Sequence, residues 1–225
     1  MARYLRIAAT IMMAVFCAGC FLWTTVPPER ETPESLYEKG HKDYQEKNYK
    51  EAIESFQRLK EEYPLSTYAI LAELGIADSY YHDEEYISAE AAYREFIDFH
   101  PTNENLPYVV YQIGMCHFSQ MLDVDRDQTE TRLAKESFEK VIARYPTSTY
   151  SFTAEQKLRD CRKRLGEHEF YVGEYYFNRE NYRAALSRFE VVARDYSNLG
   201  LDYKVSYYIH ETRRLLAKEE KKGAD

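Results

Sequence analysis

The chain has 225 residues, of which 44% are hydrophobic and 30% charged, and its net charge is −8 at pH 7. That balance supplies a folded core and excludes a disordered chain, and the acidic excess argues against a general nucleic-acid binder, which needs a phosphate-neutralising surface. Only 8 glycines and 7 prolines stand beside 22 tyrosines, so we expect a mainly helical protein rather than a β-sandwich or a glycine-looped nucleotide enzyme.

Residues 1–19 have the pattern of a secretory signal. Arg3 and Arg6 precede an apolar run of 12 residues, which is shorter than the roughly 20 that a transmembrane helix needs. The run ends in Cys17-Ala18-Gly19-Cys20, and small residues directly before a cysteine resemble the bacterial lipobox. This resemblance implies a diacylglycerol on the thiol of Cys20 and an acyl chain on its freed amine. The alternative is an ordinary cleaved signal in which the cysteine is incidental.

The segment that follows is expected to be a tether. Residues 20–33 comprise the lipidated cysteine and a flexible stretch with three prolines, which extends to at most about 45 Å. Several acyl chains together make a durable membrane anchor. Phe21 stands where an inner-membrane retention signal would place Asp, so we expect the protein at the periplasmic face of the outer membrane.

The rest of the chain carries a repeat. Each unit has an alanine with an aromatic residue four positions later, namely Ala52 and Phe56, Ala89 and Tyr93, Ala134 and Phe138, and Ala185 and Phe189. Eight positions after the aromatic residue stand Pro64, Pro101, Pro146 and, in the last unit, Ser197. Small residues precede the alanines, with Gly40, Ala77 and Gly173 twelve positions back and Gly114 twenty positions back.

This spacing is that of packed helix pairs. Small residues let two antiparallel helices approach closely, and an aromatic residue one turn after the alanine fills the gap beside the next pair. Proline then ends the second helix, and Ser66 or Thr67, like Ser148 or Thr149, is placed to cap the next one. The scheme is that of the tetratricopeptide repeat.

We therefore predict an all-α fold, a right-handed superhelix of about four to five tetratricopeptide-like hairpins with about nine helices. Residues 34–146 would hold the N-terminal units 1–3, and residues 147–225 the C-terminal units and a terminal helix. The third interval between repeat alanines leaves room for an extra helix, about 148–165, running nearly straight into 167–178. A last helix is expected over about 202–221.

An acidic loop, Met121–Glu130, is expected between the helices of unit three. Asp123, Asp125 and Asp127 alternate there as in a calcium loop. The central glycine is missing, and Ala134 stands where the twelfth-position glutamate should be. We therefore expect no metal.

No catalytic pattern emerges from the sequence. The six histidines form no H-E-x-x-H motif, and no glycine-rich phosphate loop or G-x-S-x-G elbow occurs. We accordingly expect a protein that is not an enzyme and holds no cofactor beyond its acyl chains. Cys116 and Cys161 could form a disulfide or be two small core residues, and the apolar face that Cys161 shares with Ala154, Leu158 and Leu165 favours the second reading.

Aromatic residues recur where a ligand would lie. Solenoids of this kind bind extended segments along the first helix of each pair. In this register the inner positions are Tyr37, His41, Tyr44 and Gln45, then Leu74, Asp78, Tyr81 and His82, then Tyr108, Tyr111, Met115 and Phe118. Tyrosine offers a large contact area and a polar tip, although any single one could simply pack between helices. As a peptide groove we select Tyr37, His41, Tyr44, Asp78, Tyr81, Tyr111 and Phe118.

A second candidate surface is basic. Lys157–Arg164 has five basic residues in eight, which could meet an acidic partner or could simply be a solvated helix edge.

Together these features resemble the BamD/ComL family of outer-membrane assembly lipoproteins. The stretches that carry the resemblance are Leu36-Tyr37-x-x-Gly40, Asn48-Tyr49-x-x-Ala52-Ile53-x-x-Phe56, Glu62-Tyr63-Pro64-x-Ser66-x-Tyr68-Ala69, Arg162-x-Arg164-Leu165, Glu169-Phe170-x-Val172-Gly173-x-Tyr175-Tyr176, Asn181-Tyr182-x-Ala184-Ala185 and Arg194-Asp195-Tyr196.

The resemblance implies a non-enzymatic role in the machinery that folds β-barrels into the outer membrane. The N-terminal units would receive the C-terminal strand of an unfolded barrel protein. The C-terminal half would hold the POTRA domain of the insertase, with Arg162, Arg188 and Arg194 as candidate contacts. The alternative is a periplasmic scaffold lipoprotein for envelope division or peptidoglycan synthesis.

Overall fold

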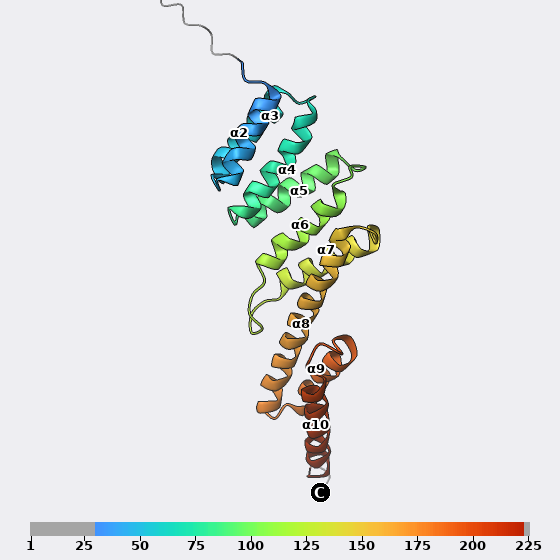
Figure 1. Ribbon diagram of the computed structural model, residues 1–225. Coiled ribbons are helices and arrows are strands. Elements are labelled where there is room, and N and C mark those ends of the chain that lie inside the picture. The colour runs from blue at the N-terminus through green and yellow to red at the C-terminus, as the bar shows by residue number, and fades with distance from the viewer. Residues whose placement is uncertain (1–29, 223–225) are drawn as a thin grey trace, which may run out of the picture.

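The computed structural model describes residues 30–222, and over this range it contains nine helices and no strand. The helices are α2 (Pro33–Gln45), α3 (Tyr49–Glu62), α4 (Thr67–His82), α5 (Tyr86–Phe99), α6 (Leu106–Ser119), α7 (Thr129–Arg144), α8 (Thr149–Asn178), α9 (Tyr182–Asp195) and α10 (Asp202–Lys222). Successive helices pack against one another in chain order along one long axis (Figure 1). The predicted all-α stack of tetratricopeptide-like hairpins is confirmed.

The expected signal peptide, the lipidated Cys20 and residues 21–29 of the tether lie outside the described residues. Within them, the hydroxyl of Thr32 caps α2 by accepting a 3.1 Å hydrogen bond from the backbone N–H of Ser35. Pro33 is the first helical residue, where its missing N–H costs nothing.

The repeat alanines and aromatic residues form the core, and all eight are buried. The small residues before them are needed because the aromatic rings lie against the backbone. A Cβ atom on Gly40 would lie 2.7 Å from the Phe56 ring, and one on Gly114 would lie 2.7 Å from the Phe138 ring. A second glycine, Gly75 of α4, lies on the other side of Phe56, 2.6 Å from its ring by the same measure.

The ends of the helices follow the sequence signals. The second helices α3, α5 and α7 each end two residues before the repeat proline, because the residue preceding proline is excluded from helical geometry. Ser66 and Ser148, rather than the following threonines, supply the N-caps of α4 and α8, each accepting a 3.2 Å bond from a tyrosine N–H two residues on.

The turns inside three hairpins share a left-handed residue. Lys47, Glu84 and Glu180 have φ of 65°, 62° and 61° and stand between the first and second helix of their pairs. Glycine is the residue that tolerates this geometry best. Each of the three turns has a residue with a side chain at this position instead and therefore carries backbone strain.

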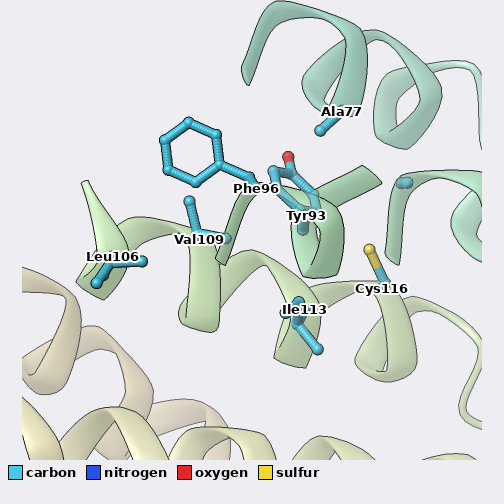
Figure 2. Close-up of a cluster of buried hydrophobic side chains, with 8 residues drawn as sticks. Ala77, Tyr93, Phe96, Leu106, Val109, Ile113 and Cys116 are labelled. Carbon is cyan, nitrogen blue, oxygen red and sulfur yellow. The ribbon is translucent and has the colours of Figure 1, made fainter. Parts of the chain in front are cut away.

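The two cysteines pack in separate parts of the core. Cys116 of α6 is buried with Ala77 and Tyr93 between α4, α5 and α6 (Figure 2). Cys161 of α8 is buried with Phe138 and Ala154, and its sulfur lies 4.0 Å from that of Met121. Both thiols are free, so the interpretation as core residues holds and no disulfide joins them.

Helix α8 links the two halves of the stack. It runs unbroken through 30 residues, as the sequence predicted for 148–178. Gly166 at its middle allows close packing, since a Cβ there would lie 2.9 Å from Cβ of Tyr196.

The acidic loop of unit three is shorter than expected. It ends at Gln128, because Asp127 accepts a 2.8 Å bond from the N–H of Thr129 and so starts α7 there. The buried amide of Gln128 donates to the carbonyls of Asp123 and Arg126. From α8, Arg164 donates to the carbonyl of Leu122 at 2.6 Å. The loop is therefore held to the helix that begins the C-terminal half.

Candidate peptide-binding surface

The residues selected as a peptide groove lie on the first helices α2, α4 and α6. We call them the aromatic wall: Tyr37, His41 and Tyr44 on α2, Asp78 and Tyr81 on α4, and Tyr111 and Phe118 on α6. His41 is exposed, and the other six are intermediate in exposure. The five rings among these six residues pack against the core on one side and keep some surface open.

The α2 end of the wall is a stack of rings. The imidazole of His41 lies parallel to the Tyr37 ring with a centroid distance of 5.9 Å. Tyr37 also contacts Phe56 of the core at 5.8 Å and Tyr68 of α4 at 5.4 Å. Because Tyr37 is held from two sides by other helices, its ring is fixed in place before any ligand arrives.

A second group of rings joins α2 to α4. Tyr44 packs edge-on against Tyr49 at 5.8 Å and against His82 at 5.6 Å. Burial, with the negative charge of Asp78 as a second cause, raises the pKa of Tyr44 to about 12. Its hydroxyl therefore stays protonated at neutral pH and can both donate and accept a hydrogen bond.

Tyr81 continues this group toward α6. Its ring packs edge-on against Tyr86 at 5.5 Å, and its hydroxyl lies 3.2 Å from that of Ser119 at the end of α6. Burial raises the pKa of Tyr81 as well. A tyrosine side chain thus spans the space between the first helices of units two and three.

Asp78 serves as an anchor within the wall. Its Oδ1 accepts hydrogen bonds of 2.5 Å from the hydroxyls of Tyr93 and Tyr108, and Gln112 donates to Tyr108 at 3.1 Å. Burial raises the pKa of Asp78 against the opposing effect of the two hydroxyls. No described residue donates to Oδ2 of Asp78, so that oxygen remains an open acceptor.

The α6 part of the wall faces the start of α8. Tyr111 lies 5.6 Å from Tyr150 of α8 and 5.8 Å from Phe138, ring centre to ring centre. Phe118 packs edge-on against Phe138, and the Lys157 ammonium lies 4.3 Å above the Phe118 ring. Sequence reasoning did not select Tyr150, and it placed Lys157 in the separate basic segment rather than in the groove, because the N-terminal half of α8 has no counterpart in a regular repeat.

The three arginines of the predicted partner interface are differently engaged. Arg188 pairs with Glu169 at 2.8 Å, and Arg162 donates to the backbone carbonyl of Asp195 at 3.1 Å. Arg194 is exposed and pairs at 2.8 Å with its neighbour Asp195. Of the three, Arg194 is the most accessible to another protein.

Within residues 30–222, no three His, Cys, Asp or Glu side chains are arranged to hold a metal ion. In the same range, no helix is both long and apolar enough to cross a bilayer.

Comparison with known proteins places these features in one family. The family model described as the outer membrane lipoprotein YfiO matches residues 29–224. A relative from Rickettsia prowazekii, named outer membrane protein assembly factor BamD, is 30% identical over 182 residues, which cover 81% of this chain and 72% of the relative. A relative of the same name from Neisseria meningitidis serogroup A is 27% identical over 208 residues, covering 86% of this chain and 78% of that one.

Among solved structures, the TPR2AB domain of yeast Sti1 in complex with pHSP90 matches 82% of this chain and 74% of its own at 16% identity, with a TM-score of 0.47. That superposition is loose, so the assignment rests on the family model and the relatives. The chain belongs to the BamD family of outer membrane lipoproteins that the YfiO model describes.

Proposed function

We propose that this protein is a non-enzymatic, lipid-anchored component of the machinery that inserts β-barrel proteins into the outer membrane. The names of its relatives support a role in outer membrane protein assembly. The observation that carries the proposal is the aromatic wall, whose rings are held by α2, α4 and α6 yet keep part of their surface open. Anchoring through acyl chains on Cys20 would keep this wall near the periplasmic face of the membrane.

The wall suits an extended chain rich in aromatic and apolar residues, such as the C-terminal strand of an unfolded barrel protein. Tyrosine rings provide contact area at little cost in conformational entropy. The hydroxyl of Tyr44 and the free Oδ2 of Asp78 supply acceptors for backbone N–H groups, which an isolated strand leaves unpaired. Recognition would thus depend on strand conformation and apolar side chains more than on one sequence.

The C-terminal half would contact the POTRA domain of the insertase. Arg194 is the first candidate because it is exposed and pairs only with the adjacent Asp195 among described residues. Arg188 is paired with Glu169, and Arg162 donates to a backbone carbonyl. To bind the POTRA domain, each guanidinium would have to leave its present partner, or the contact would be made by the aliphatic part of the side chain.

Binding of a labelled peptide tests the wall. The double variant Tyr37→Ala and Tyr81→Ala is expected to bind the C-terminal peptide of a barrel protein at least about tenfold more weakly, because two ring contacts are lost. Tyr203→Ala and Tyr207→Ala, two exposed tyrosines of α10, form the matched control and should leave the affinity unchanged. Unchanged binding by a folded Tyr37 and Tyr81 variant would refute the wall as the binding surface.

Co-purification with the lipidated chain separates the machinery from the alternative scaffold role. Recovery of the insertase is expected, and its loss on Arg194→Glu would identify the contact. Recovery of division or cell-wall proteins without the insertase would reverse the proposal.

A further inference from the structure

A cleft of about 710 Å³ lies on a different side of α4 from the aromatic wall. It is bounded by α3 and α5, with α4 as its floor. Glu73, Ile76 and Tyr80 line it from α4, and their spacing of three and four residues places them along one stripe of that helix. Asp78 and Tyr81 of the wall belong to another stripe. We call this space the outer cleft.

The rim of the outer cleft is acidic. Glu61 of α3, Glu73 of α4 and Glu95 of α5 contribute three carboxylates, against the single ammonium of Lys60. Lys60 lies 3.0 Å from Glu95 and 3.9 Å from Glu73. No described residue forms an ion pair with Glu61, so the rim keeps a negative charge that its own lysine does not neutralise.

The α5 side of the cleft has an ordered pattern. Ile87, Ala91, Glu95 and Phe99 follow one another at intervals of four, so they form one stripe along α5. Ala91 and Glu95 line the cleft, whereas Ile87 and Phe99 lie one turn beyond them on the same stripe and are 78% and 67% exposed. Large apolar side chains that are this exposed next to a cleft are typical of contact sites. The small Ala91 leaves room between them, and Glu95 supplies the charge.

From this pattern we propose that the outer cleft is a docking site for an amphipathic helix of a partner protein, one that presents a basic residue between two apolar residues. In a helix docked parallel to α5, apolar residues eight positions before and four positions after the basic residue would match Ile87, Glu95 and Phe99 across about 18 Å of helix. A Lys or Arg in the centre would meet the carboxylates of Glu61 and Glu95, and its apolar neighbours would cover the two exposed side chains.

Charge complementarity selects this occupant. The protein is acidic overall, with a net charge of −8, so a second copy of the chain would bring like charge to an already negative rim. An acidic or purely apolar helix would leave Glu61 desolvated without a partner, which is costly. This inference concerns a surface separate from the aromatic wall and stands or falls independently of the proposed function.

A designed peptide tests the proposal with the full chain. The probe is a fluorescein-labelled, 15-residue helical peptide of alanine and glutamine that carries Leu-x7-Arg-x3-Leu. Its matched partner has Glu in place of Arg. Anisotropy is expected to show at least about tenfold tighter binding of the Arg peptide. The double variant Glu61→Arg and Glu95→Arg should reverse that preference, since both positions are exposed and the fold is retained.

Two substitutions separate the cleft from general electrostatic attraction. Ala91→Trp fills the cleft and should abolish binding, whereas Ala217→Trp on an exposed position of α10 should not. The Tyr37→Ala and Tyr81→Ala variant should bind the peptide as the parent does. Equal binding of both peptides, or unchanged binding by Ala91→Trp, would overturn the proposal. So would a dimer in sedimentation that Ala91→Trp dissociates, because the occupant would then be a second copy.

Discussion

The backbone of Gly173 and the ring of Phe189 are in direct contact, so that a Cβ atom on the glycine would lie 2.5 Å from Cε1 of the phenylalanine. Gly173 belongs to α8 and Phe189 to α9, and both are buried. Helices α8 and α9 are therefore packed as closely as their backbones and the ring of Phe189 allow. The same relation joins Gly40 to Phe56 and Gly114 to Phe138, which makes it the packing rule of the fold.

Replacing Gly173 with Ala should therefore destabilise the protein even though alanine is the better helix former. Overpacking a core costs about 1–3 kcal/mol, and alanine returns about 1 kcal/mol in helix propensity. Urea denaturation should show a net loss, and adding Phe189→Leu should recover part of it by making space. Ser187→Ala, on the exposed side of α9, is the control. A more stable Gly173→Ala variant would contradict this account of the packing.

Glu84→Gly is expected to stabilise the protein. Glu84 has a φ of 62° in the turn between α4 and α5, where a residue with a side chain carries strain of about 1–2 kcal/mol. Glycine removes the strain but has a more flexible unfolded state, so the net gain should be about 0.5–1 kcal/mol. Lys140→Gly in the exposed middle of α7 should instead lose about 1 kcal/mol. Thermal denaturation measures the stability of both variants. If Glu84→Gly is less stable than the parent protein, the turn at Glu84 carries no strain that glycine can relieve.

The stability of the protein should depend on pH through Asp78. Burial raises the pKa of this carboxyl above its ordinary value of 3.8, so the folded protein holds the proton more tightly than the unfolded chain. The resulting stabilisation is complete below pH 3.8 and is lost as the pH rises through the folded-state pKa. The free-energy advantage of the parent over Asp78→Asn should accordingly shrink as the pH increases.

Urea denaturation at a series of pH values measures that difference directly. Asp98→Asn, at an exposed position of α5, controls for the loss of one carboxylate. If the advantage over Asp78→Asn instead grew with pH, the hydroxyls of Tyr93 and Tyr108 would outweigh burial.

Removing the contacts that hold the loop between α6 and α7 should increase the motion of that loop without lowering the stability of the whole protein. Arg164 donates to the carbonyl of Leu122, and Nδ1 of His168 lies 2.6 Å from the carbonyl oxygen of Val124. Arg164→Ala should speed hydrogen exchange of the loop amides while barely changing the melting temperature, because the buried Gln128 still holds the loop from within. Lys163→Ala, an exposed neighbour on α8, should change neither. Exchange that stays slow in Arg164→Ala would show that the clamp is unimportant.

Much of the fold could be predicted because each signal acts locally. The interval from alanine to aromatic residue to proline depends on one helix and its end, so Ala52, Phe56 and Pro64 suffice to place α3. The end of the loop at Gln128, two residues before the predicted Glu130, depends on a single Asx turn in which Asp127 accepts the N–H of Thr129.

The site was harder to predict because it depends on distances between helices. The repeat register placed Asp78 and Tyr108 on first helices, but nothing in the sequence showed that one would donate to the other at 2.5 Å. The outer cleft was not expected at all. It arises because small residues such as Ala91 and Ala92 of α5 stand opposite α3, a relation between segments that periodicity within each helix does not reveal.

The uninterrupted α8 has a mechanical consequence. At 30 residues it is about 45 Å long, and it shares its first turns with one half of the stack and its last with the other. Bending such a rod would break backbone hydrogen bonds in a segment that holds both halves. Because α8 packs against both α7 and α9, we expect a displacement of α9 and α10 to be transmitted along it to α7 rather than absorbed by a hinge between the two halves.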